Sequence, residues 1–388
     1  MTSMTKHTLV DCFSLRARIG WQGLRSDEFK TEGAYLVTGW DFLNGRINWD
    51  DCYHVSIDRF ERDKGIQLRE NDLLVTKDGT VGKTAFVVDC PKQATLNSHI
   101  FLIRSKDGSV EPAYLYYVLN SYIFADFMKN ILTGTTIKGL TQGNFYKFTF
   151  DAPDVPTQRK IVKVLEATDA VIGQTRDAIK KYKAVKKGLL QDLFHEGESV
   201  SLSDKRYFII NPSARKLPSS FYYIDLESVV DGMLLMMKQE ERLSAPSRAQ
   251  RLLQKNDILF QMVRPYQQNN LLFALESDLP FVASTGYAQI RTNQNPVYVY
   301  YALHTFDFMR EVNQRCTGSS YPAINSTELS KVQFRLPDRK KQDEIARYMT
   351  SIDDTMQDEL KSLEKFESIK QGLLKDLLSG ALGVPAQM

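Results

Sequence analysis

Residues 153–193 read PDVPTQRKIVKVLEATDAVIGQTRDAIKKYKAVKKGLLQDL, and a related segment, PDRKKQDEIARYMTSIDDTMQDELKSLEKFESIKQGLLKDL, occupies residues 337–377. Both segments begin with Pro-Asp and end with Gly-Leu-Leu, one variable residue and Asp-Leu. Shorter matches precede them in the same order, at an offset near 184 residues: 71–74 with 256–259, 112–119 with 296–303, and 133–135 with 317–319. Matches that keep one order indicate that the chain is an internal duplication.

The repeated segments have the hydrophobic period of long paired helices. Apolar or small residues recur in alternating steps of four and three over about five heptads, and Lys186 fills the one slot that interrupts the first series. We predict two helices of roughly 40 residues, about 60 Å long, that pair as an antiparallel coiled coil. Two separate amphipathic helices, each lying on its own domain, are the alternative. The predicted seam comprises Ile161, Leu165, Ile172, Ile179, Leu189 and Leu193 in the first segment and Ile345, Met349, Ile352, Met356, Leu363, Phe366, Leu373 and Leu377 in the second.

Both predicted helices carry start and stop signals. Asp154 and Asp338 each follow a proline and are expected N-caps, while Gly197 and Gly380 follow the last periodic residues and are expected to stop the helices. Each copy therefore consists of a mixed portion followed by one helix. The predicted regions are 1–153, 154–198, 199–337 and 338–388.

The mixed portions have the pattern of α/β domains. Residues 72–76, 85–88, 100–103 and 257–261 are expected strands, and residues 113–128 are an expected helix rich in aromatic residues. We expect the tyrosines of this helix to belong to the core. Combined with the repeat, this pattern predicts two α/β domains that alternate with two long helices and are related by a pseudo-twofold axis.

The composition supports a folded chain and excludes several kinds of protein. The length of 388 residues suggests two to four units, and 43% of the residues are hydrophobic. The formal charge of +3 neither requires nor excludes a nucleic-acid partner. Four cysteines lie at least 38 residues apart without nearby paired histidines, so we expect structural thiols and no metal site. No segment has the length and apolarity to cross a bilayer, so a cytoplasmic location without membrane contact is expected.

The stretch KDGTVGKTAF, residues 77–86, superficially resembles a phosphate-binding loop. Such a loop needs four residues between its first glycine and Gly-Lys-Ser/Thr, but Gly79 stands too close to Gly82 and position 77 is a lysine. The aligned stretch of the second half, residues 261–270, contains no glycine. We therefore expect no nucleotide site, whereas loops that read two different base sequences would be expected to differ in this way.

Short loops in both halves are rich in residues that contact DNA. Lysine and arginine suit guanine edges or phosphates, asparagine and glutamine suit adenine, and serine or threonine suits either. For any single residue a solvated loop is an equal explanation, but two copies of the set favour DNA. The candidate DNA-binding residues are Thr76, Lys77, Asp78, Thr80, Lys83, Asn97, Ser98, His99, Thr135 and Lys138 in the first half and Arg264, Tyr266, Gln267, Gln268, Asn269, Ser284, Thr285, Ser319, Ser320 and Tyr321 in the second.

The chain has a duplicated α/β domain, and each copy ends in a proline hinge, a glutamine near the helix start (Gln158, Gln342) and a helix ending in Gly-Leu-Leu-x-Asp-Leu. In these features the chain resembles the specificity subunit of type I restriction-modification systems. The segments NDLLVTKDGTVGK and TGTTIKGLT also look like the target recognition domains of that family. The resemblance covers essentially the whole chain and is sharpest at residues 153–193 and 337–377. The second half lacks the Gly-x-x-Gly-Lys element, which changes how its loop would contact DNA but not the architecture.

The resemblance implies a non-catalytic DNA reader. Regions 1–153 and 199–337 would be target recognition domains, each reading one half of a bipartite, asymmetric target in double-stranded DNA, and the spacer helices would act as a ruler that fixes the gap. Two modification subunits, which would carry S-adenosylmethionine and methylate adenine, would dock on the chain, and two restriction subunits with ATP and Mg²⁺ would join them. No cofactor is expected on this chain.

Three other functions are less well supported. A stand-alone adenine methyltransferase would need an Asn-Pro-Pro-Tyr-like loop, but residues 295–298 lack the second proline and the chain has no glycine-rich cofactor loop. Asp338, Glu359 and Lys361 match a loose metal-nuclease pattern, yet Asp338 and Glu359 lie about 30 Å apart along one expected helix. A coiled-coil adaptor without DNA binding is compatible with the helices, but two loop-bearing domains disfavour it.

Overall fold

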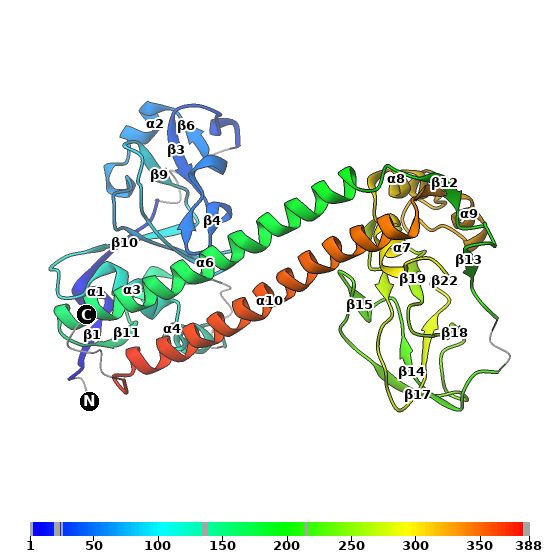
Figure 1. Ribbon diagram of the computed structural model, residues 1–388. Coiled ribbons are helices and arrows are strands. Elements are labelled where there is room, and N and C mark those ends of the chain that lie inside the picture. Colours follow the sequence, from blue (N-terminus) through cyan, green and yellow to red (C-terminus); the bar gives the residue numbers. More distant parts are fainter. Residues whose placement is uncertain (1–2, 19–23, 25, 134–138, 214–215, 383–388) are drawn as a thin grey trace. The chain divides into compact units, whose positions relative to one another are not determined.

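The computed structural model describes residues 3–18, 24, 26–133, 139–213 and 216–382. The chain divides into two units, which are Met1–Thr175 with Ser362–Met388 (unit 1) and Arg176–Lys361 (unit 2). Each unit contains one α/β domain and part of both long helices, α6 (Val155–Asp192) and α10 (Arg339–Leu378) (Figure 1). The unit boundaries therefore fall inside the two helices.

The centre of unit 1 is an antiparallel four-stranded sheet in the order β2-β10-β7-β8 (Phe13–Arg16, Ile100–Ser105, Leu73–Thr76 and Thr84–Phe86). A three-stranded sheet in the order β6-β3-β9 (Tyr53–Val55, Ala34–Val37 and Ala94–Leu96) packs nearby. Two pairs complete the strands: β1 (Thr5–Thr8) with β11 (Thr149–Ala152), and β4 (Phe42–Leu43) with β5 (Arg46–Ile47). The helices are α1 (Leu9–Cys12), α2 (Ile57–Glu61), α3 (Pro112–Leu119), α4 (Tyr122–Thr133) and α5 (Gln142–Phe145).

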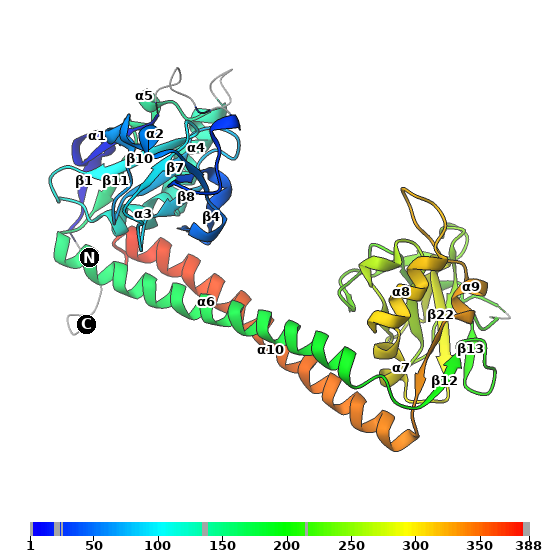
Figure 2. The ribbon, with the colours of Figure 1, turned by 90° about the horizontal axis from the view of Figure 1, so that it is seen from above.

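Unit 2 repeats this plan. Its central antiparallel sheet has the order β13-β22-β19-β20 (Phe208–Ile210, Tyr287–Thr292, Ile258–Gln261 and Leu271–Leu272). A second sheet has the order β17-β14-β21-β18 (Lys238–Glu241, Ser220–Ile224, Phe281–Ser284 and Ala249–Leu252). The strand pairs are β12 (Glu198–Ser201) with β23 (Gln333–Leu336) and β15 (Val229–Val230) with β16 (Met233–Leu234). The helices α7 (Pro296–Ala302), α8 (Phe306–Arg315) and α9 (Ser326–Lys331) share one hydrophobic core with the central sheet (Figure 2).

The central strands are buried on both faces, which explains their unbroken apolar sequences. In β7, Leu73 and Val75 join the core under the helices, while Leu74 joins the core shared with the three-stranded sheet. In β19, Ile258 and Phe260 face the helices, and Leu259 faces the second sheet. Successive side chains of a strand point to opposite faces, so both faces need apolar residues. The strands expected at residues 72–76, 100–103 and 257–261 are confirmed, and the one expected at 85–88 lies slightly earlier, at Thr84–Phe86.

The prediction of a single helix at residues 113–128 was wrong, because the structure has two helices there. The first, α3, ends at Leu119, and Ser121 starts the second by accepting a hydrogen bond at its hydroxyl from the Ile123 N–H (3.2 Å). Unit 2 has the same break between α7 and α8. The tyrosines of α3 are buried as expected, and Tyr114 and Tyr117 are at most 1% exposed.

The expected starts of both long helices are confirmed. The Asp154 carboxylate accepts a hydrogen bond from the Thr157 N–H (3.0 Å), and the Asp338 carboxylate accepts one from the Lys341 N–H (2.9 Å). These bonds satisfy amide groups that have no partner within the helix.

The expected helix stops are half right. Gly380 has a left-handed backbone (φ 71°) two residues after the last residue of α10. Gly197 does not end α6, which already ends at Asp192. Instead, a Cβ at Gly197 would lie 2.4 Å from the Leu336 carbonyl, so only glycine allows the chain to enter β12 this close to β23.

The glutamine near each helix start joins the helix to its own domain. Gln158 is fully buried; its carbonyl accepts from the Glu111 N–H (2.8 Å), and its amide donates to the Pro153 carbonyl (2.8 Å). In unit 2, Gln342 accepts from the Asn295 N–H (3.0 Å) and donates to the Pro337 carbonyl (2.8 Å). A buried amide that keeps its hydrogen bonds on both sides fixes the angle at which the helix leaves the domain.

Each unit's core takes in the beginning of one long helix and the end of the other. In unit 1 the core includes Ile161 and Leu165 of α6 with Leu374 and Leu377 of α10. In unit 2 the core includes Ile345 and Met349 of α10, with Leu189 and Leu193 of α6 packed against them. The two helices therefore run antiparallel within each unit, as predicted. Every residue of the predicted seam is buried or half-buried.

A polar triad crosses the helix pair in each unit. In unit 2, Lys186 contacts the Asp353 carboxylate (2.6 Å), which also accepts a hydrogen bond from the Tyr301 hydroxyl of α7. In unit 1 the equivalent residues are Lys370, Asp169 and Tyr117, with a lysine-to-carboxylate distance of 2.6 Å and a tyrosine-to-carboxylate distance of 2.9 Å. The lysine that interrupts the apolar seam is thus the cation of an ion pair between α6 and α10, and the tyrosine joins this pair to the α/β domain of the unit. Burial and the Asp353 hydrogen bond raise the pKa of Tyr301.

Replacing Lys186 by methionine is expected to destabilise unit 2, since Asp353 would keep its charge without a partner. The side chains of Lys186 and Asp353 are 28% and 32% exposed. We therefore expect about 1–2 kcal/mol, less than the ~3–5 kcal/mol of a fully buried pair. Scanning calorimetry would show a transition lowered by about 2–8 °C for a unit of this size.

A matched control is Lys361→Met in the same helix pair, because Lys361 and its partner Asp358 are 74% and 77% exposed. This change should leave the transition nearly unmoved. The double variant K186M/D353L should recover much of the loss of K186M. If K186M had the same melting temperature as K361M, the triad would contribute nothing to stability.

Candidate nucleic-acid interface

A buried aspartate holds the strand that precedes each main loop. Asp72 accepts hydrogen bonds from the Arg69 N–H (2.7 Å) and from the Arg104 guanidinium (2.6 Å). Asp257 likewise accepts from the Gln254 N–H (2.7 Å) and from the Arg291 guanidinium (2.7 Å). The asparagine before each aspartate has a left-handed backbone, with φ 66° at Asn71 and 72° at Asn256, which asparagine tolerates better than most residues. The repeated Asn-Asp-Leu/Ile-Leu sequence therefore builds the same rigid base in both units.

Backbone hydrogen bonds gather three loops of unit 1 at the end of β7. The Lys77 N–H donates to the His99 carbonyl (2.9 Å), and the Lys77 carbonyl accepts from the Leu140 N–H (2.8 Å). The Lys83 amine donates to the Gly39 carbonyl (3.0 Å), which adds the turn that follows β3. Residues that are far apart in sequence therefore meet on one surface.

The side chains of this loop cluster differ in their availability. Thr76 is 4% exposed, and its hydroxyl bonds the Thr80 carbonyl and accepts from the Lys83 N–H (3.0 Å), so it stabilises the loop and its burial argues against a DNA contact. Lys77 is half-buried with its amine 5.7 Å from the centre of the Phe101 ring. His99 contacts Asp78 (2.7 Å), and both side chains are exposed. Within the part of the chain that the structure describes, the amines of Lys77 and Lys83 are therefore two cationic groups with no carboxylate bonded to them.

The remaining candidates of the first half lie beside these groups. Thr80 is exposed, Asn97 and Ser98 are half-buried, and the Asn97 side chain accepts a hydrogen bond from the His99 N–H (3.0 Å). Thr135 and Lys138 lie outside the residues that the structure describes.

The second unit gathers its loops around Arg264. The Arg264 N–H donates to the Pro322 carbonyl (2.7 Å), and the Ile324 N–H donates to the Met262 carbonyl (3.0 Å). The guanidinium lies 4.3 Å from the centre of the Tyr321 ring, which is 67% exposed. Among the described residues, the buried Nε of Arg264 has no hydrogen-bond partner. Two sequence-predicted residues, the half-buried Arg264 and the exposed Tyr321, therefore form one stacked pair.

The other candidates of the second half divide by burial. Tyr266, Ser319 and Ser320 are exposed. Gln267, Gln268 and Asn269 lie along one turn, where the Gln261 amide donates to the Gln267 side chain (3.0 Å). Thr285 is half-buried, whereas Ser284 is 3% exposed and accepts a hydrogen bond from the Gly286 N–H (3.2 Å). Ser284, like Thr76, is placed as a structural residue.

Two glycine turns next to the loops were missed by the sequence reasoning. Asn44-Gly45 joins β4 to β5, and Asp231-Gly232 joins β15 to β16, all four with positive φ. A Cβ at Gly45 would lie 1.9 Å from the Tyr116 hydroxyl, and one at Gly232 would lie 2.6 Å from the Tyr300 hydroxyl. An Asn-Gly or Asp-Gly pair is a recognisable hairpin signal, so the sequence did contain evidence for both turns.

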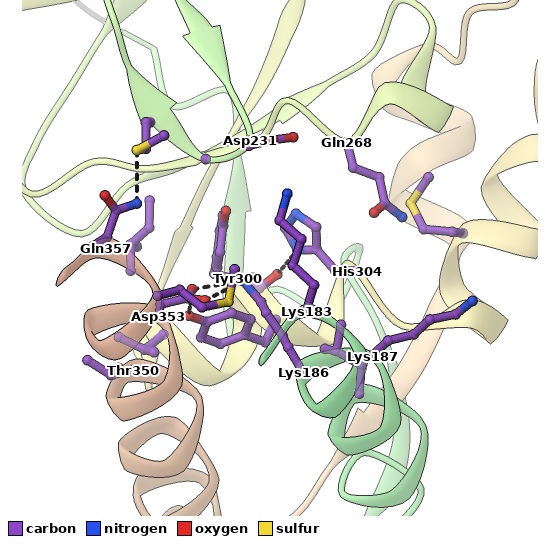
Figure 3. A pocket seen from close by; sticks show the side chains of 18 of the residues that line it. Lys183, Lys186, Lys187, Asp231, Gln268, Tyr300, His304, Thr350, Asp353 and Gln357 are labelled. Carbon is purple, nitrogen blue, oxygen red and sulfur yellow. Dashed lines mark hydrogen bonds and ion pairs between the residues drawn. The ribbon is translucent and has the colours of Figure 1, made fainter. Parts of the chain in front are cut away.

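A pocket of about 790 Å³ lies within unit 2, between the helix pair and the hairpin of β15 and β16 (Figure 3). Lys183, Lys186 and Lys187 of α6 contribute one wall, and Asp353 and Gln357 of α10 contribute another. Gln268, a predicted DNA-binding residue, lies at its edge.

His304 lies at the floor of this pocket as a neutral, half-buried ring. Its Nδ1 donates to the Tyr300 carbonyl (2.7 Å), and its Nε2 accepts from the Asn270 amide (3.0 Å). Burial, together with the positive charge of Lys186, lowers the pKa of His304 to about 4 from its ordinary value of 6.5. The residue 184 positions earlier is Asn120, whose side chain bonds Thr84 (2.8 Å).

Unit 2 is therefore expected to lose stability in mild acid. A folded pKa of about 4 means that the unfolded chain binds a proton first, so stability is complete above pH 6.5 and falls as the pH drops from 6.5 to about 4. The loss should be on the order of 3 kcal/mol. His304→Asn, which copies unit 1, should remove this part of the pH dependence of the melting temperature. Equal slopes for H304N and the parent between pH 4 and 6.5 would contradict the account.

The described residues contain neither a metal-binding cluster nor a membrane-spanning helix. No group of three histidine, cysteine or carboxylate side chains there is placed to hold a metal ion. Within the same part of the chain, no helix is long and apolar enough to span a membrane. The four cysteines are not in disulfides; Cys12 and Cys52 are buried, and burial raises the pKa of the Cys52 thiol to about 12.

Comparison with known proteins gives one consistent family. A family model described as type I restriction modification DNA specificity domain matches residues 22–181 and 242–370. The type I restriction enzyme MjaVIII specificity subunit of Methanocaldococcus jannaschii is 22% identical over 357 residues, which cover 83% of this chain and 81% of that protein.

Solved structures share the whole fold. The crystal structure of a type I restriction-modification S subunit from M. genitalium matches with a TM-score of 0.59 and 16% identity, covering 97% of this chain and 96% of that one. A chain from a structure concerning complex assembly and conformational transition of the type I R-M system matches with a TM-score of 0.57 and 16% identity, covering 98% of both chains. The predicted fold class of two α/β domains alternating with two long helices is confirmed.

Proposed function

The chain belongs to the family of type I restriction-modification DNA specificity domains, and on that premise we propose that it reads a bipartite, asymmetric DNA target with one half-site for each unit. It is the DNA sequence-specificity subunit of a type I restriction-modification enzyme. The observation that carries the two-reader proposal is that both units share one rigid frame but present different loops on it.

The shared frame consists of contacts that recur in the same places. The Asp72–Arg104 pair recurs as Asp257–Arg291, at 2.6 Å and 2.7 Å. The hinge glutamine and the lysine-aspartate-tyrosine triad also recur. In contrast, the loop after β7 of unit 1 is Lys-Asp-Gly-Thr-Val-Gly-Lys, and the loop after β19 of unit 2 begins Met-Val-Arg-Pro-Tyr. A frame that stays the same while its loops change suits two readers of different base sequences.

The long helices support a spacer role. The 38 residues of α6 and 40 of α10 would each measure roughly 57–60 Å at the usual rise of about 1.5 Å per residue. We propose that this helix pair fixes the gap between the half-sites. Helices whose apolar seam is closed by the partner helix keep their exposed faces available for other subunits.

The proposal assigns catalysis to partner subunits. Two modification subunits would bring S-adenosylmethionine and methylate adenine in each half-site, and two restriction subunits would bring ATP and Mg²⁺. This chain would bind no cofactor and perform no catalysis. The structure concerning assembly of a type I R-M system is one of its fold relatives, which supports partners of this kind.

DNA binding by the chain assembled with its modification subunit should depend steeply on salt. Lysine and arginine contacts to phosphates release counterions, so six to ten contacts would reduce affinity by about 10³–10⁵ between 50 and 200 mM salt. Fluorescence anisotropy with a labelled duplex at several salt concentrations measures this slope. Tight assembly without any DNA binding at low salt would favour the adaptor instead.

A further inference from the structure

Trp40 is the most exposed tryptophan among the described residues, at 95% exposure. The side chain stands on a 3₁₀ turn, Gly39–Asp41, that follows β3 in unit 1. Leaving an indole in water is unfavourable, because its apolar area would gain about 25 cal/mol per Å² on burial. Tryptophan is enriched at binding sites for this reason.

The turn that carries Trp40 is rigid. The Thr38 hydroxyl accepts a hydrogen bond from the Trp40 N–H (3.3 Å), and the Asp41 carboxylate accepts one from the Thr38 N–H (2.6 Å). Asp41 is 5% exposed, and burial raises the pKa of its carboxyl group. The backbone of this turn is already ordered before a ligand arrives, so binding loses little backbone entropy.

The turn is also part of the loop cluster that carries the lysines. The Gly39 carbonyl accepts a hydrogen bond from the Lys83 amine (3.0 Å), and a Cβ at Gly39 would lie 3.0 Å from the Thr76 side chain. Lys77 and His99 belong to the same cluster through the backbone bond between them (2.9 Å). An aromatic surface beside cationic groups suits a groove of duplex DNA, where apolar base edges such as the thymine methyl lie next to phosphates.

Unit 2 builds the same turn with another residue at its tip. Trp40 stands four residues before the Asn44-Gly45 hairpin, and Glu227 stands four residues before the Asp231-Gly232 hairpin. The two capping residues are in the opposite order, with the aspartate first in unit 2 and the hydroxyl residue first in unit 1. The Asp225 N–H donates to the Ser228 hydroxyl (3.2 Å), and this hydroxyl donates to the Asp225 carboxylate (2.7 Å). Glu227 is exposed, like Trp40. A conformation kept in both units with a different exposed residue is the pattern that half-site-specific contacts would show.

We propose that Trp40 is a DNA contact of unit 1 that packs its indole on a nucleotide of the half-site read by that unit. The proposal rests on the two-reader function and adds a residue to it. The contact acts on one half-site only, because the matching position of unit 2 carries Glu227.

The test uses the chain assembled with its modification subunit and duplexes carrying the sequence that this assembly methylates. Three duplexes are compared by anisotropy: the intact target, one with the half-site of unit 1 scrambled, and one with the half-site of unit 2 scrambled. Trp40→Ala should weaken binding to the intact target by about 5- to 150-fold, and Trp40→Phe should retain most of the affinity. On the duplex without the half-site of unit 1, W40A and the parent should bind alike.

Controls separate this proposal from the two-reader function. Glu227→Ala should keep full discrimination of the half-site of unit 1. Failure of the parent assembly to bind any duplex would contradict the function itself. Normal DNA binding by W40A on all duplexes, or loss of co-purification with the modification subunit instead of loss of DNA binding, would overturn the proposal for Trp40.

Discussion

Lys77→Ala is expected to weaken recognition of one half of the target only, and Arg264→Ala is expected to weaken recognition of the other half only. The two residues lie on corresponding loops of different units. Each loss should be about 1–3 kcal/mol for a contact to a base edge, or roughly 5- to 150-fold in affinity. Binding is measured on targets in which one half-site at a time is scrambled.

Lys77 suits this test because its side chain does not hold its loop together. The loop bonds to His99 and Leu140 come from the Lys77 backbone and survive in alanine, whereas the Lys83 side chain bonds the Gly39 carbonyl. Arg264→Lys provides a matched control for unit 2, since it keeps the charge but loses the planar group that lies over Tyr321. Equal losses on both half-sites for Lys77→Ala and Arg264→Ala would contradict two independent readers.

Insertion of seven residues into both long helices should lengthen the gap in the target. Seven residues preserve the period of the apolar seam and add about 10 Å, or about three base pairs at 3.4 Å each. Suitable positions are after Thr175 in α6 and after Lys361 in α10, where the two units divide. The gap is read by sequencing the methylated sites of cells that carry the variant.

An insertion in α6 alone serves as the control, because it breaks the match between the two seams and should abolish methylation of every spacing. A double insertion that methylates sites with the original gap would show that the helices do not set the spacing.

The duplication and the helix pair could be predicted because their signals are local and repeated. Gly-Leu-Leu-x-Asp-Leu and the heptad period occur twice in the sequence. The role of Lys186 could not be predicted in the same way. Its partners, Asp353 and Tyr301, are distant in sequence, and only the folded unit brings the three side chains together.

The errors have identifiable physical causes. The aromatic run at residues 113–128 has helical composition throughout, but side-chain hydrogen bonds at Asn120 and Ser121 break it into two helices. Gly197 looks like a helix stop from its position, yet its role is the close approach to Leu336. The first error arose from side-chain hydrogen bonds inside the segment, and the second from a close contact with a distant strand.

The candidate interface stays a prediction, and the structure separates its residues by burial. Thr76 and Ser284 have the composition of contact residues and are buried as loop supports. Trp40 was not among the predicted contacts, because a tryptophan usually belongs to the core, and only the fold shows that its side chain is exposed.

The most direct measurement is modified-base sequencing of DNA from cells that express this chain with its neighbouring methyltransferase subunit, compared with cells that lack this chain. The account predicts a methylated bipartite motif, with two different halves and a fixed gap, that appears only when the chain is present. Absence of any such motif while the methyltransferase subunit is active would contradict the assignment of this chain as the DNA reader.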